Sequence, residues 1–500
     1  MKVAGLSRQT RRPNFLGQRI TVFGLSRSGT AAAAMLSQLG AAVLCTDIRP
    51  IDQLRSAIDD LADTSMLAQY PIDYVLGQHN YRCIEKADLI VVSPGVPVDQ
   101  VPILSEAKQQ RIPIVSELEV ASSVCLAPII AITGTKGKTT TTLLTGEILK
   151  QGNFRRVCVV GNIGEPFSNS VLDLTAEDIV VAEVSSFQLE ATVSFHPTIS
   201  AILNLSPDHL DRHRTLEAYQ QAKQKIYANQ TADDWIVLNA DDPYTASLTD
   251  LNQAETCVRP AFFSQTIVDK TMVYRQNGQI YAPNYAAKQS SDTGSRKQSY
   301  ICDREPISLA GNHNLDNILS AVAIGQICRI PVLKIRQALY NFKATDHASL
   351  RHAFESVQQI NGIDFIDDSK ATNVAATQAA LRSISTTGRR ILLIMGGYDK
   401  GNDYTPLIGL IKSRVKVLIL LGQQTQTIRN ALSDYVVTLS TPTMELAVEQ
   451  AFQTAVSGDT VLLSPANASY DMFIDYKDRG SSFQQAIAKL DKQTCSSEKH

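Results

Sequence analysis

The stretch Ala131-Ile-Thr-Gly-Thr-Lys-Gly-Lys-Thr-Thr-Thr-Thr142 runs from an apolar segment into a glycine turn, a lysine and a row of hydroxyls. A strand, a glycine turn and a helix start are typical of a loop that holds nucleotide phosphates, because small residues let successive backbone N–H groups face an anion. The usual spacing GxxxxGK[ST] is not met, since Ile132 stands five positions before Gly137. Lys138 can still reach the β- and γ-phosphates, and Thr139 can ligate Mg²⁺. The alternative is a threonine-rich helix start with a solvated lysine; the combined features favour the nucleotide site.

Length and composition indicate a globular protein of several domains. The chain has 500 residues, of which 44% are hydrophobic and 19% charged, and its formal net charge is −2. At about 150 residues per domain, this length predicts roughly three domains. The near-neutral charge gives no general reason to bind nucleic acid, and no apolar run is long enough to span a membrane. Eight cysteines stand singly, without a CxxC pair, which favours reduced thiols. We expect a cytoplasmic monomer that does not bind nucleic acid and does not insert into a membrane.

Short apolar runs alternate with helical stretches, which predicts domains built from parallel βα units. We expect three α/β domains, at residues 1–125, 126–345 and 346–500. The polar tract Ala287–Ser299 is expected to be a surface excursion or a disordered loop. The predicted strands, in chain order, are Arg19–Gly24, Ala42–Asp47, Ala87–Ser93, Ile112–Ser116, Arg156–Gly161, Asp178–Glu183, Thr198–Leu205, Asp234–Asn239, Asp364–Asp367, Arg390–Gly396, Val415–Gly422 and Thr460–Ser464.

The first βα turn, Gly24-Leu-Ser-Arg-Ser-Gly29, imitates the dinucleotide motif GxGxxG. In the motif, the second glycine lets the backbone approach a pyrophosphate closely, and here Ser26 takes its place. Asp47 ends the next strand and can bind a ribose hydroxyl, and Arg49 can bind a phosphate. These residues leave three possibilities open: NAD, another nucleotide, or a plain βαβ turn.

Several polar residues follow the strands of the central region. Glu183 ends an apolar strand beyond the phosphate loop, where a carboxylate can hold Mg²⁺ directly or through water. His209 follows the next strand, which favours a role at the same sheet edge. Lys223 lies in a helix, and nothing in its pattern distinguishes it from an ordinary exposed lysine. Asn314 and Asn317, at a later helix start, can bind the edge of an adenine ring or cap the helix.

Polar clusters also follow three strands of the last region, at Asp367–Asn373, Gly396–Lys400 and Ser464–Ser469. Lys370 and Lys400 place two cations at one sheet edge, where they can clamp a small dicarboxylate and a phosphate reaction centre. The alternative is a pair of solvated loop lysines. Without a family, these features predict an ATP- and Mg²⁺-dependent enzyme of three domains that joins two anionic substrates.

The order of motifs along the chain resembles the Mur ligases. The similarity runs from Gly24 to about Gly480. The motifs SSFQLE and DSKATN resemble those of the family members that add D-glutamate to UDP-N-acetylmuramoyl-L-alanine in peptidoglycan precursor synthesis. The matching motifs are TGTKGKTTT, GNIG, EVSSFQLE, NLSPDHLDRH, AKQKIY, NADD, GNHNLDN, DDSKATN, MGGYDKG and LLSPANASYDMF.

This resemblance implies a Rossmann-like N-terminal domain that binds UDP, a central P-loop ATPase-type domain and a Rossmann-like C-terminal domain that binds the amino acid. UDP then replaces NAD as the expected ligand of the first domain. The implied contacts to the UDP substrate are Arg27, Ser28, Asp47, Arg49, Ser93, Pro94, Gly95 and, on the muramoyl part, Asn162.

The resemblance also implies the roles of the other two domains. The residues implied to bind ATP are Gly134, Thr135, Lys136, Gly137, Lys138, Thr139, Thr140, Asn314, Asn317, Asp368 and Lys370. One Mg²⁺ would be bound by Thr139 and Glu183 and a second by His209, while CO₂ would carbamylate Lys223 into a carboxylate-like metal partner. The implied catalytic residues are Lys138, Glu183, His209, Lys223 and Lys370, and those binding D-glutamate are Thr372, Lys400, Ser469 and Tyr476.

Two positions depart from the family pattern. Ala353 stands where the family has an arginine, and Arg351 is a candidate to replace it; Tyr476 stands at a phenylalanine position. The implied reaction is activation of a carboxylate as an acyl phosphate, followed by amide formation as the third domain closes on the second. Two alternatives are another amide ligase of the superfamily, such as a folylpolyglutamate synthase, and a non-catalytic ATP-binding regulatory protein. The first of these lacks a Rossmann-like N-terminal domain.

Overall fold

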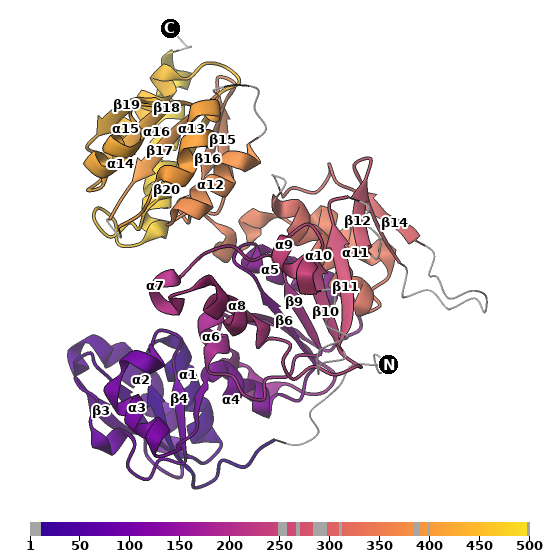
Figure 1. Ribbon diagram of the computed structural model, residues 1–500, viewed down its shortest axis with the longest axis vertical. Helices are drawn as coiled ribbons and strands as arrows, with labels where there is room; N and C mark the ends of the chain where they lie inside the picture. Colours follow the sequence, from indigo (N-terminus) through magenta and orange to yellow (C-terminus); the bar gives the residue numbers. More distant parts are fainter. Residues whose placement is uncertain are drawn as a thin grey trace. The chain divides into compact units, whose positions relative to one another are not determined.

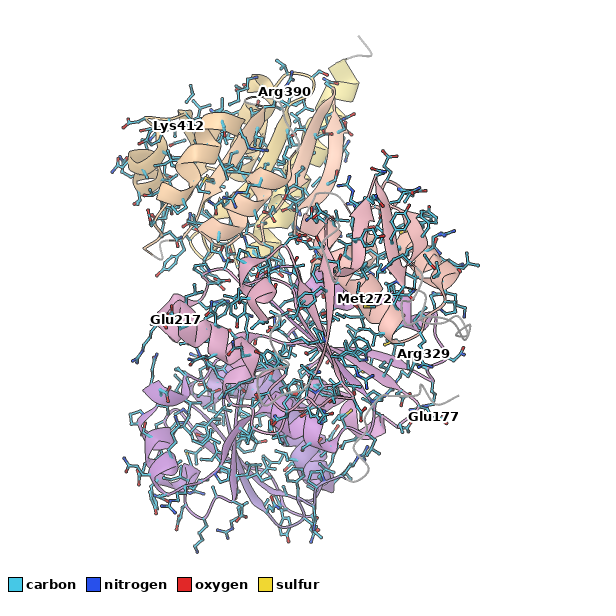
Figure 2. All side chains as sticks on the ribbon, turned by 45° about the vertical axis from the view of Figure 1, so that its right-hand side comes forward. Glu177, Glu217, Met272, Arg329, Arg390 and Lys412 are labelled. Atoms are coloured by element: carbon cyan, nitrogen blue, oxygen red, sulfur yellow. The ribbon has the colours of Figure 1, made fainter. Side chains whose placement is uncertain are left out.

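The computed structural model describes residues 12–248, 258–266, 271–283, 298–309, 313–384, 388, 390–398 and 401–497. The chain forms two compact units (Figure 1). Unit 1 contains Met1–Ser308 and Asn314–Phe342, and unit 2 contains Leu309–His313 and Lys343–His500. Side chains such as Glu177, Glu217 and Lys412 are exposed, whereas Met272 is buried (Figure 2).

The first sheet of unit 1 is parallel and has the strand order β3-β2-β1-β4-β5. Its strands are β1 Arg19–Phe23, β2 Ala42–Asp47, β3 Asp73–Leu76, β4 Leu89–Val92 and β5 Ile114–Ser116. The helices are α1 Arg27–Gln38, α2 Ile51–Leu67, α3 Pro102–Gln109 and α4 Glu117–Val124. Leu36 and Leu54 pack on one face and Leu104 on the other, so helices cover both faces. The chain adds strands on one side of β1 and then, from β4 on, on its other side. Ligands of doubly wound sheets bind at the carboxyl ends of the two strands where this direction changes, here β1 and β4.

The second sheet of unit 1 has the order β14-β13-β12-β11-β10-β9-β6-β8-β7. The seven strands β6 to β12 pair in parallel, and β13 and β14 add an antiparallel edge beside β12. The strands are β6 Ile129–Thr133, β7 Val157–Gly161, β8 Ile179–Glu183, β9 Ile199–Ile202, β10 Trp235–Asn239, β11 Arg259–Ser264, β12 Thr271–Gln276, β13 Gln279–Pro283 and β14 Gln298–Asp303. The helices are α5 Lys138–Lys150, α6 Ser186–Glu190, α7 Leu210–His213, α8 Leu216–Gln224, α9 Pro243–Ser247, α10 His313–Ile327 and α11 Val332–Asn341. The central strands β6, β8 and β9 are wholly buried.

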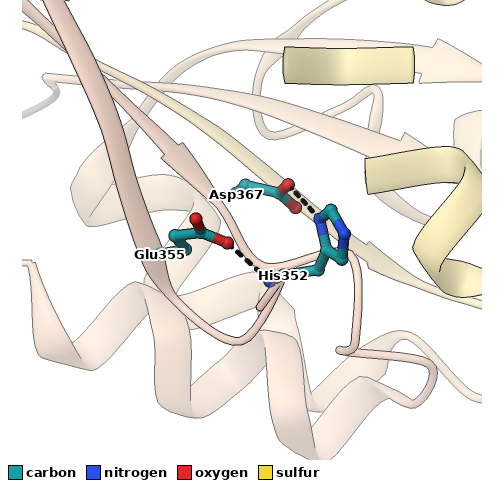
Figure 3. A group of neighbouring side chains, drawn as sticks. All are labelled: His352, Glu355 and Asp367. Atoms are coloured by element: carbon teal, nitrogen blue, oxygen red, sulfur yellow. Dashed lines mark hydrogen bonds and ion pairs between the residues drawn. The ribbon is translucent and has the colours of Figure 1, made fainter. Parts of the chain in front are cut away.

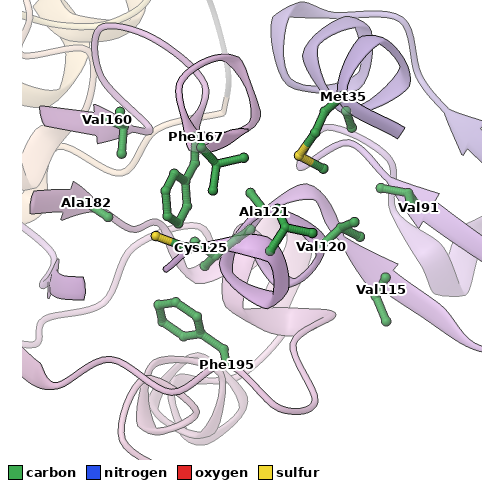
Figure 4. Packing of buried hydrophobic residues seen from close by; sticks show 14 of the residues in the cluster. Met35, Val91, Val115, Val120, Ala121, Cys125, Val160, Phe167, Ala182 and Phe195 are labelled. Carbon is green, nitrogen blue, oxygen red and sulfur yellow. The ribbon is translucent and has the colours of Figure 1, made fainter. Parts of the chain in front are cut away.

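The two sheets of unit 1 share one hydrophobic core. Val120 and Ala121 of α4 pack with Met35 from the first sheet's layer and with Phe167 and Phe195 from the second (Figure 4). Buried carboxylates reinforce this junction. Glu119 accepts hydrogen bonds from the backbone N–H groups of Val193, Ser194 and Phe195, and Glu117 Oε1 accepts two from Ser168. The first two α/β layers therefore form one compact body.

Unit 2 is a six-stranded sheet of order β15-β16-β20-β17-β18-β19, parallel except for β15. Phe483 of α16 packs on one face and Leu432 of α14 on the other. The strands are β15 Glu355–Ile360, β16 Ile363–Asp367, β17 Ile391–Gly396, β18 Val415–Leu421, β19 Val437–Thr441 and β20 Thr460–Ala466. The helices are α12 Val374–Ser383, α13 Ile408–Arg414, α14 Thr425–Leu432, α15 Met444–Thr454 and α16 Tyr476–Ser497.

The predicted α/β class is confirmed, and each predicted strand coincides with a strand of the structure. The edge strands β3, β14, β15 and β19 and the interior strands β11, β12 and β13 were not predicted. Most of the polar tract, residues 287–297, lies outside the described residues, but Gln298 and Ser299 begin β14 rather than belonging to a loop. The exact boundaries at residues 125/126 and 345/346 stay predictions.

Candidate active site

The phosphate-type loop joins β6 to α5, as its sequence predicts. Gly134 and Gly137 have φ angles of +153° and +81°, which side-chain-bearing residues rarely adopt. Asn204 braces the loop from the end of β9: its carbonyl accepts from Thr135 N–H (3.1 Å) and its Oδ1 from Lys136 N–H (2.9 Å). Thr139 and Thr140 are the second and third residues of α5. The loop therefore leads into a helix N-terminus, which favours an anion there.

Two lysines converge on this loop. Lys138 Nζ donates to the carbonyls of Gly134 (2.9 Å) and Thr135 (3.0 Å). Lys223 Nζ, on α8, donates to Gly134 O (3.0 Å) and to Thr133 Oγ1 (3.2 Å), and lies 4.7 Å from the ring centre of Tyr219. The two Nζ atoms therefore share the Gly134 carbonyl as an acceptor.

The pKa values of both lysines are depressed. Burial lowers the pKa of Lys138, and the charges of Glu183 and Asp208 oppose that shift. Burial, and next the charge of Lys138, hold the pKa of Lys223 well below its ordinary value. Only 1% of Lys223 is exposed, so it is not the ordinary surface lysine that its sequence pattern allowed. At neutral pH these effects favour the neutral amine of Lys223.

Glu183 lies at the end of β8 and is 2% exposed. Its Oε1 accepts from Asn162 Nδ2 (2.9 Å), and its backbone carbonyl accepts from Asn162 N–H (2.9 Å). Among the described residues, Oε2 has no hydrogen-bond donor although it is buried. A buried carboxylate oxygen without a donor is costly unless something positive binds it, so this atom suits a divalent cation.

His209 precedes α7 in a left-handed conformation, with φ of +53°. Its ring packs 4.8 Å from the ring centre of Phe187, and its carbonyl accepts from the N–H groups of Arg212 and His213. The His209 side chain is about half exposed, at 48%, whereas His213 is buried and contacts Ser186 Oγ at 2.9 Å. The exposed ring can therefore bind a ligand, while His213 has a structural position.

Asn317 of α10 lies against the phosphate loop. Its Oδ1 accepts from Thr141 Oγ1 (3.2 Å), and its Nδ2 donates to Asn314 Oδ1 (2.9 Å). A Cβ atom at position 137 would lie 2.1 Å from Asn317 Oδ1, so this close approach requires Gly137. The structure thus brings both asparagines to the start of α5; their assignment to adenine stays a prediction.

The first sheet brings together most of the residues implied for UDP. Asp47 accepts from Leu25 N–H (2.7 Å) and from the backbone and guanidinium of Arg49. Burial alone would raise the pKa of Asp47, but these bonds and the Arg49 charge lower it to about 2. Asp47 thus holds the Leu25 turn. Its contact with a ribose stays a prediction, as does the role of Ser28 on α1.

A pocket of about 490 Å³ opens beside this turn, between α1, α2 and residues 165–169. Arg27 and Arg49 line it, and Arg27 also donates to the carbonyl of Gly164. Ser93 Oγ donates to Gly24 O (2.6 Å), which ties the Ser93-Pro94-Gly95 loop to the first turn. The implied UDP residues therefore surround one edge of the sheet and include two cations.

In unit 2, the residues implied for ATP and D-glutamate follow β16 and β20. Asp368 accepts from Ser464 Oγ (2.9 Å), and Lys370 Nζ donates to Ser349 O (3.2 Å). Thr372 lies two residues after Lys370. Ser469 is buried, and the carbonyl of Tyr476, the first residue of α16, accepts from Ser369 Oγ (2.8 Å). Lys400 lies outside the described residues.

His352, Glu355 and Asp367 form a cluster with the composition of a metal site (Figure 3). His352 Nδ1 and Asp367 Oδ2 are 2.7 Å apart. Gln484 Nε2 donates to Asp367 Oδ2 (2.9 Å) and Glu355 Oε2 (3.2 Å), while Arg351 fixes this amide orientation by donating to Gln484 Oε1 (2.8 Å). An amide nitrogen occupies the position between the carboxylates, so the cluster is a hydrogen-bonded network. It supports Lys370, whose N–H donates to His352 O (2.9 Å).

Arg212 and Arg479 are two buried or nearly buried arginines for which no role was predicted. Arg479 is 2% exposed and donates to the carbonyls of Ser369 (2.8 Å) and Asn467 (3.0 Å). Arg212 contacts both sheets of unit 1. The only sequence feature that could have indicated a role was their place in Asp211-Arg212-His213 and Asp478-Arg479-Gly480, near predicted site residues.

Comparisons with known proteins match the three α/β regions in order. The family model of the Mur ligase MurD-like N-terminal domain matches residues 18–116, the Mur ligase middle domain residues 132–325, and the Mur ligase glutamate ligase domain residues 353–467. A relative from Thermoanaerobacter sp. (strain X514), named UDP-N-acetylmuramoylalanine--D-glutamate ligase, is 40% identical over 95% of this chain and 99% of its own. The chain belongs to the Mur ligase family.

Other Mur ligases agree with this membership. A protein of the same name from Geotalea uraniireducens (strain Rf4) is 40% identical, over 95% of this chain and 98% of the relative's length. Another, from Clostridioides difficile (strain 630), is 36% identical, over 95% of this chain and 99% of the relative's length. The fold is shared with a pseudomurein peptide ligase type C from Methanothermus fervidus (TM-score 0.54, 20% identity, 95% and 100% coverage). It is also shared with MurF from Acinetobacter baumannii (TM-score 0.54, 15% identity, 95% and 93% coverage).

Membership confirms the predicted family, the three α/β domains and the ligase class of enzyme. Within the part of the chain that the structure describes, no helix is long and apolar enough to cross a membrane.

Proposed function

We propose that this Mur ligase joins D-glutamate to UDP-N-acetylmuramoyl-L-alanine, with conversion of ATP to ADP and phosphate, as a step of peptidoglycan precursor synthesis in the cytoplasm. The observation that carries the proposal is the near-complete match to relatives with this activity in their name, at about 40% identity. The MurD-like N-terminal match disfavours a folylpolyglutamate synthase. The braced loop, two lysines and Glu183 disfavour a protein without turnover.

The proposed reaction has two steps. A carboxylate oxygen of the alanyl substrate attacks the γ-phosphorus of ATP, the bond to the β-phosphate oxygen breaks, and an acyl phosphate and ADP form. The neutral amine of D-glutamate then attacks the acyl carbon, the bond to the phosphate oxygen breaks, and phosphate and a proton leave. Lys138, beside the loop, is placed to neutralise the γ-phosphate, and Lys370 is the proposed stabiliser of the tetrahedral intermediate.

The remaining polar residues are proposed to bind substrates. Arg27, Arg49 and the Ser93–Gly95 loop would hold the diphosphate of UDP because they place cations and backbone groups at one sheet edge. Asn162 would contact the muramoyl part. In unit 2, Thr372, Ser469, Tyr476 and Lys400 would bind D-glutamate.

The site's residues fit Mg²⁺. Glu183 Oε2 is a buried oxygen without a donor among the described residues, and the Thr139 hydroxyl and the half-exposed His209 ring complete a suitable donor set. We assign Thr139 and Glu183 to one ion and His209 to a second. Bound Mg²⁺ would reduce the repulsion between ATP and the attacking carboxylate.

We also propose that Lys223 is carbamylated. Carbamate formation needs a neutral amine, whose lone pair bonds the carbon of CO₂ while one N–H proton is lost. The lowered pKa of Lys223 favours that amine. Two acceptors, Gly134 O and Thr133 Oγ1, match its two N–H groups and leave the lone pair for the new bond. The product is an anion, which suits the adjacent metal site.

The direct test is phosphate release from ATP with purified protein, UDP-N-acetylmuramoyl-L-alanine and either D- or L-glutamate. We expect release with D-glutamate and little with L-glutamate. Absence of release with D-glutamate would refute the proposed function. Equal release with both enantiomers would refute its stereospecificity, and glutamate-dependent release with a folate substrate would favour the folylpolyglutamate synthase alternative.

A further inference from the structure

Arg212 joins the two sheets of unit 1. Its NH1 donates to Pro94 O (2.6 Å) and its NH2 to Val96 O (3.3 Å), both in the loop after β4 of the first sheet. Its Nε and NH2 also donate to Glu190 Oε2 (3.1 and 2.5 Å), on α6 of the second sheet. Only 14% of the Arg212 side chain is exposed, so these bonds are well shielded from water.

The loop that Arg212 holds is part of the proposed UDP site. Ser93 Oγ donates to Gly24 O, and Val96 N–H donates to Ser93 O (2.9 Å). A Cβ atom at position 24 would lie 3.0 Å from Val96 Cγ2 and 3.1 Å from Ser93 Cβ. The first turn and this loop are therefore packed without spare room, and a shift in one displaces the other.

The same arginine shapes the surroundings of His209. Arg212 N–H donates to His209 O (3.1 Å), so both residues belong to one helical turn. The guanidinium carbon lies 4.4 Å from the ring centre of Phe187, and that ring also contacts His209 at 4.8 Å. Displacing the guanidinium would therefore free the Phe187 ring that packs on His209 and remove a side-chain anchor from the helical turn that carries His209.

We propose that Arg212 is a positioning residue that couples the UDP-binding loop Ser93–Val96 to His209, so that binding of the UDP substrate and of a divalent cation strengthen each other. The inference rests on the proposed function for the identity of both ligands. Arg212 itself touches neither ligand. Its planar, multidentate guanidinium reaches two carbonyls and a carboxylate on two elements, which a single ammonium cannot do.

The coupling can be measured without turnover. Mn²⁺ binding to the full chain is followed by electron paramagnetic resonance in the presence of a non-hydrolysable ATP analogue, with and without UDP-N-acetylmuramoyl-L-alanine. We expect the substrate to tighten Mn²⁺ binding by about 5-fold or more in the unchanged protein, in the usual range of coupling between sites. By reciprocity, Mn²⁺ should tighten substrate binding by the same factor in calorimetry.

Arg212→Gln should reduce this factor to less than about 2-fold and weaken Mn²⁺ binding in the substrate complex. The sign is informative, because removing a positive charge near a cation site would by electrostatics alone tighten Mn²⁺ binding. Arg212→Lys should restore little coupling. The matched control is Arg214→Gln: Arg214 lies two residues away, is exposed, and is expected to keep full coupling.

If Arg212→Gln does not fold, Glu190→Gln provides the second test, since it keeps the side-chain size and removes the charged acceptor. An unchanged coupling factor in a folded Arg212→Gln or Glu190→Gln protein that still releases phosphate would overturn this inference alone. An equal loss of Mn²⁺ affinity with and without the substrate would also overturn it, because Arg212 would then only support the fold. Absence of D-glutamate-dependent phosphate release in the unchanged protein would instead contradict the proposed function.

Discussion

Asn162 Nδ2 donates a 2.9 Å hydrogen bond to Oε1 of Glu183, which leaves the buried Oε2 as the oxygen without a donor among the described residues. The backbone N–H of Asn162 also donates to the Glu183 carbonyl, and a Cβ atom at Gly161 would lie 2.3 Å from that carbonyl oxygen. The GNIG and AEVSS segments are therefore locked together. Asn162 orients the carboxylate so that one oxygen can bind a cation.

Glu183→Gln should reduce phosphate release by about 10²-fold or more, because a neutral amide does not replace a metal-binding carboxylate worth several kcal/mol. Asn162→Ala should have a smaller effect, about 10- to 100-fold, as expected for a residue that orients a ligand. Steady-state assays over a range of Mg²⁺ concentrations distinguish the two, since the asparagine variant should partly recover at high Mg²⁺. Full activity of Glu183→Gln would exclude the carboxylate from the metal site.

The buried Lys223 should carry a carbamate at pH values where ordinary lysines do not. A surface lysine with a pKa of about 10.4 is almost wholly protonated at pH 7.5. Lys223 has a lowered pKa and keeps its neutral amine to lower pH, so carbamate should persist near neutral pH and disappear on acidification. ¹³C-bicarbonate NMR measures this directly. Lys223→Arg should abolish the carbamate signal and the activity, whereas Lys225→Arg, two residues away, should keep the carbamate; a signal that survives Lys223→Arg would contradict the assignment.

Most strands could be predicted because central parallel strands are continuous apolar runs. Ile391–Gly396 is buried at every position, and its sequence ILLIMG shows this. Three of the strands that were not predicted, β3, β15 and β19, lie at sheet edges and are partly polar, whereas β11, β12 and β13, which were also not predicted, lie inside their sheet. Val437–Thr441, VTLST, has one buried residue, and Glu355–Ile360, ESVQQI, pairs antiparallel at an edge. Edge strands carry a weaker hydrophobic signal because one side faces solvent.

The residues of the candidate site also fall into those that local sequence predicts and those that only the tertiary structure shows. Lys138 at a helix start and Glu183 at a strand end could be predicted from local sequence, because the ends of these elements are visible in it. The burial of Lys223 and the contacts of Arg212 and Arg479 depend on carbonyls brought together by tertiary structure. Arg212, for example, meets Pro94, which is 118 positions earlier in the chain. No local pattern records such a contact, so these arginines had no prediction.

Gly137→Ala should weaken ATP binding. The residue has a φ of +81°, and an added Cβ would lie 2.1 Å from Asn317 Oδ1, so the loop or Asn317 must move. Backbone strain of this kind costs about 1–3 kcal/mol, which corresponds to roughly a tenfold or larger rise in the KM for ATP. The KM for D-glutamate should change little. Gly409→Ala is the control, because a Cβ there meets nothing within 4 Å; an unchanged KM for ATP in Gly137→Ala would show that the loop tolerates the shift.

Arg479→Lys should damage the proposed D-glutamate site and lower the stability of unit 2. The guanidinium donates to Ser369, beside Lys370, and to Asn467, near Ser469, and one ammonium cannot reach all these acceptors. Each buried acceptor left without a donor costs about 1–3 kcal/mol, so we expect a lower melting temperature and a KM for D-glutamate raised about tenfold. Burial lowers the pKa of Arg479 to about 10, so the group is still charged at pH 8 and the effect should not depend on pH from 6 to 8. Arg382→Lys, at an exposed position of α12, is the control and should leave both quantities unchanged.

Glu117→Gln should change how the stability of unit 1 depends on pH. Burial raises the pKa of Glu117, although the hydrogen bonds from Ser168 oppose the shift. The folded state therefore holds this proton more tightly than an unfolded chain, in which the glutamate pKa is about 4.3. The stabilisation of the folded state by proton binding is full below that value and is lost as the pH rises through the folded-state pKa. The free energy of unfolding of the unchanged protein, relative to Glu117→Gln, should thus increase as the pH falls from 7 to 5, by about 1.4 kcal/mol per tenfold difference in proton affinity. Urea unfolding followed by the fluorescence of Trp235, the single tryptophan of the chain and part of β10, measures unit 1 specifically. Glu147→Gln, at a half-buried position of α5, is the control and should run parallel to the unchanged protein. A parallel curve for Glu117→Gln would mean that this buried carboxyl does not bind a proton in that range.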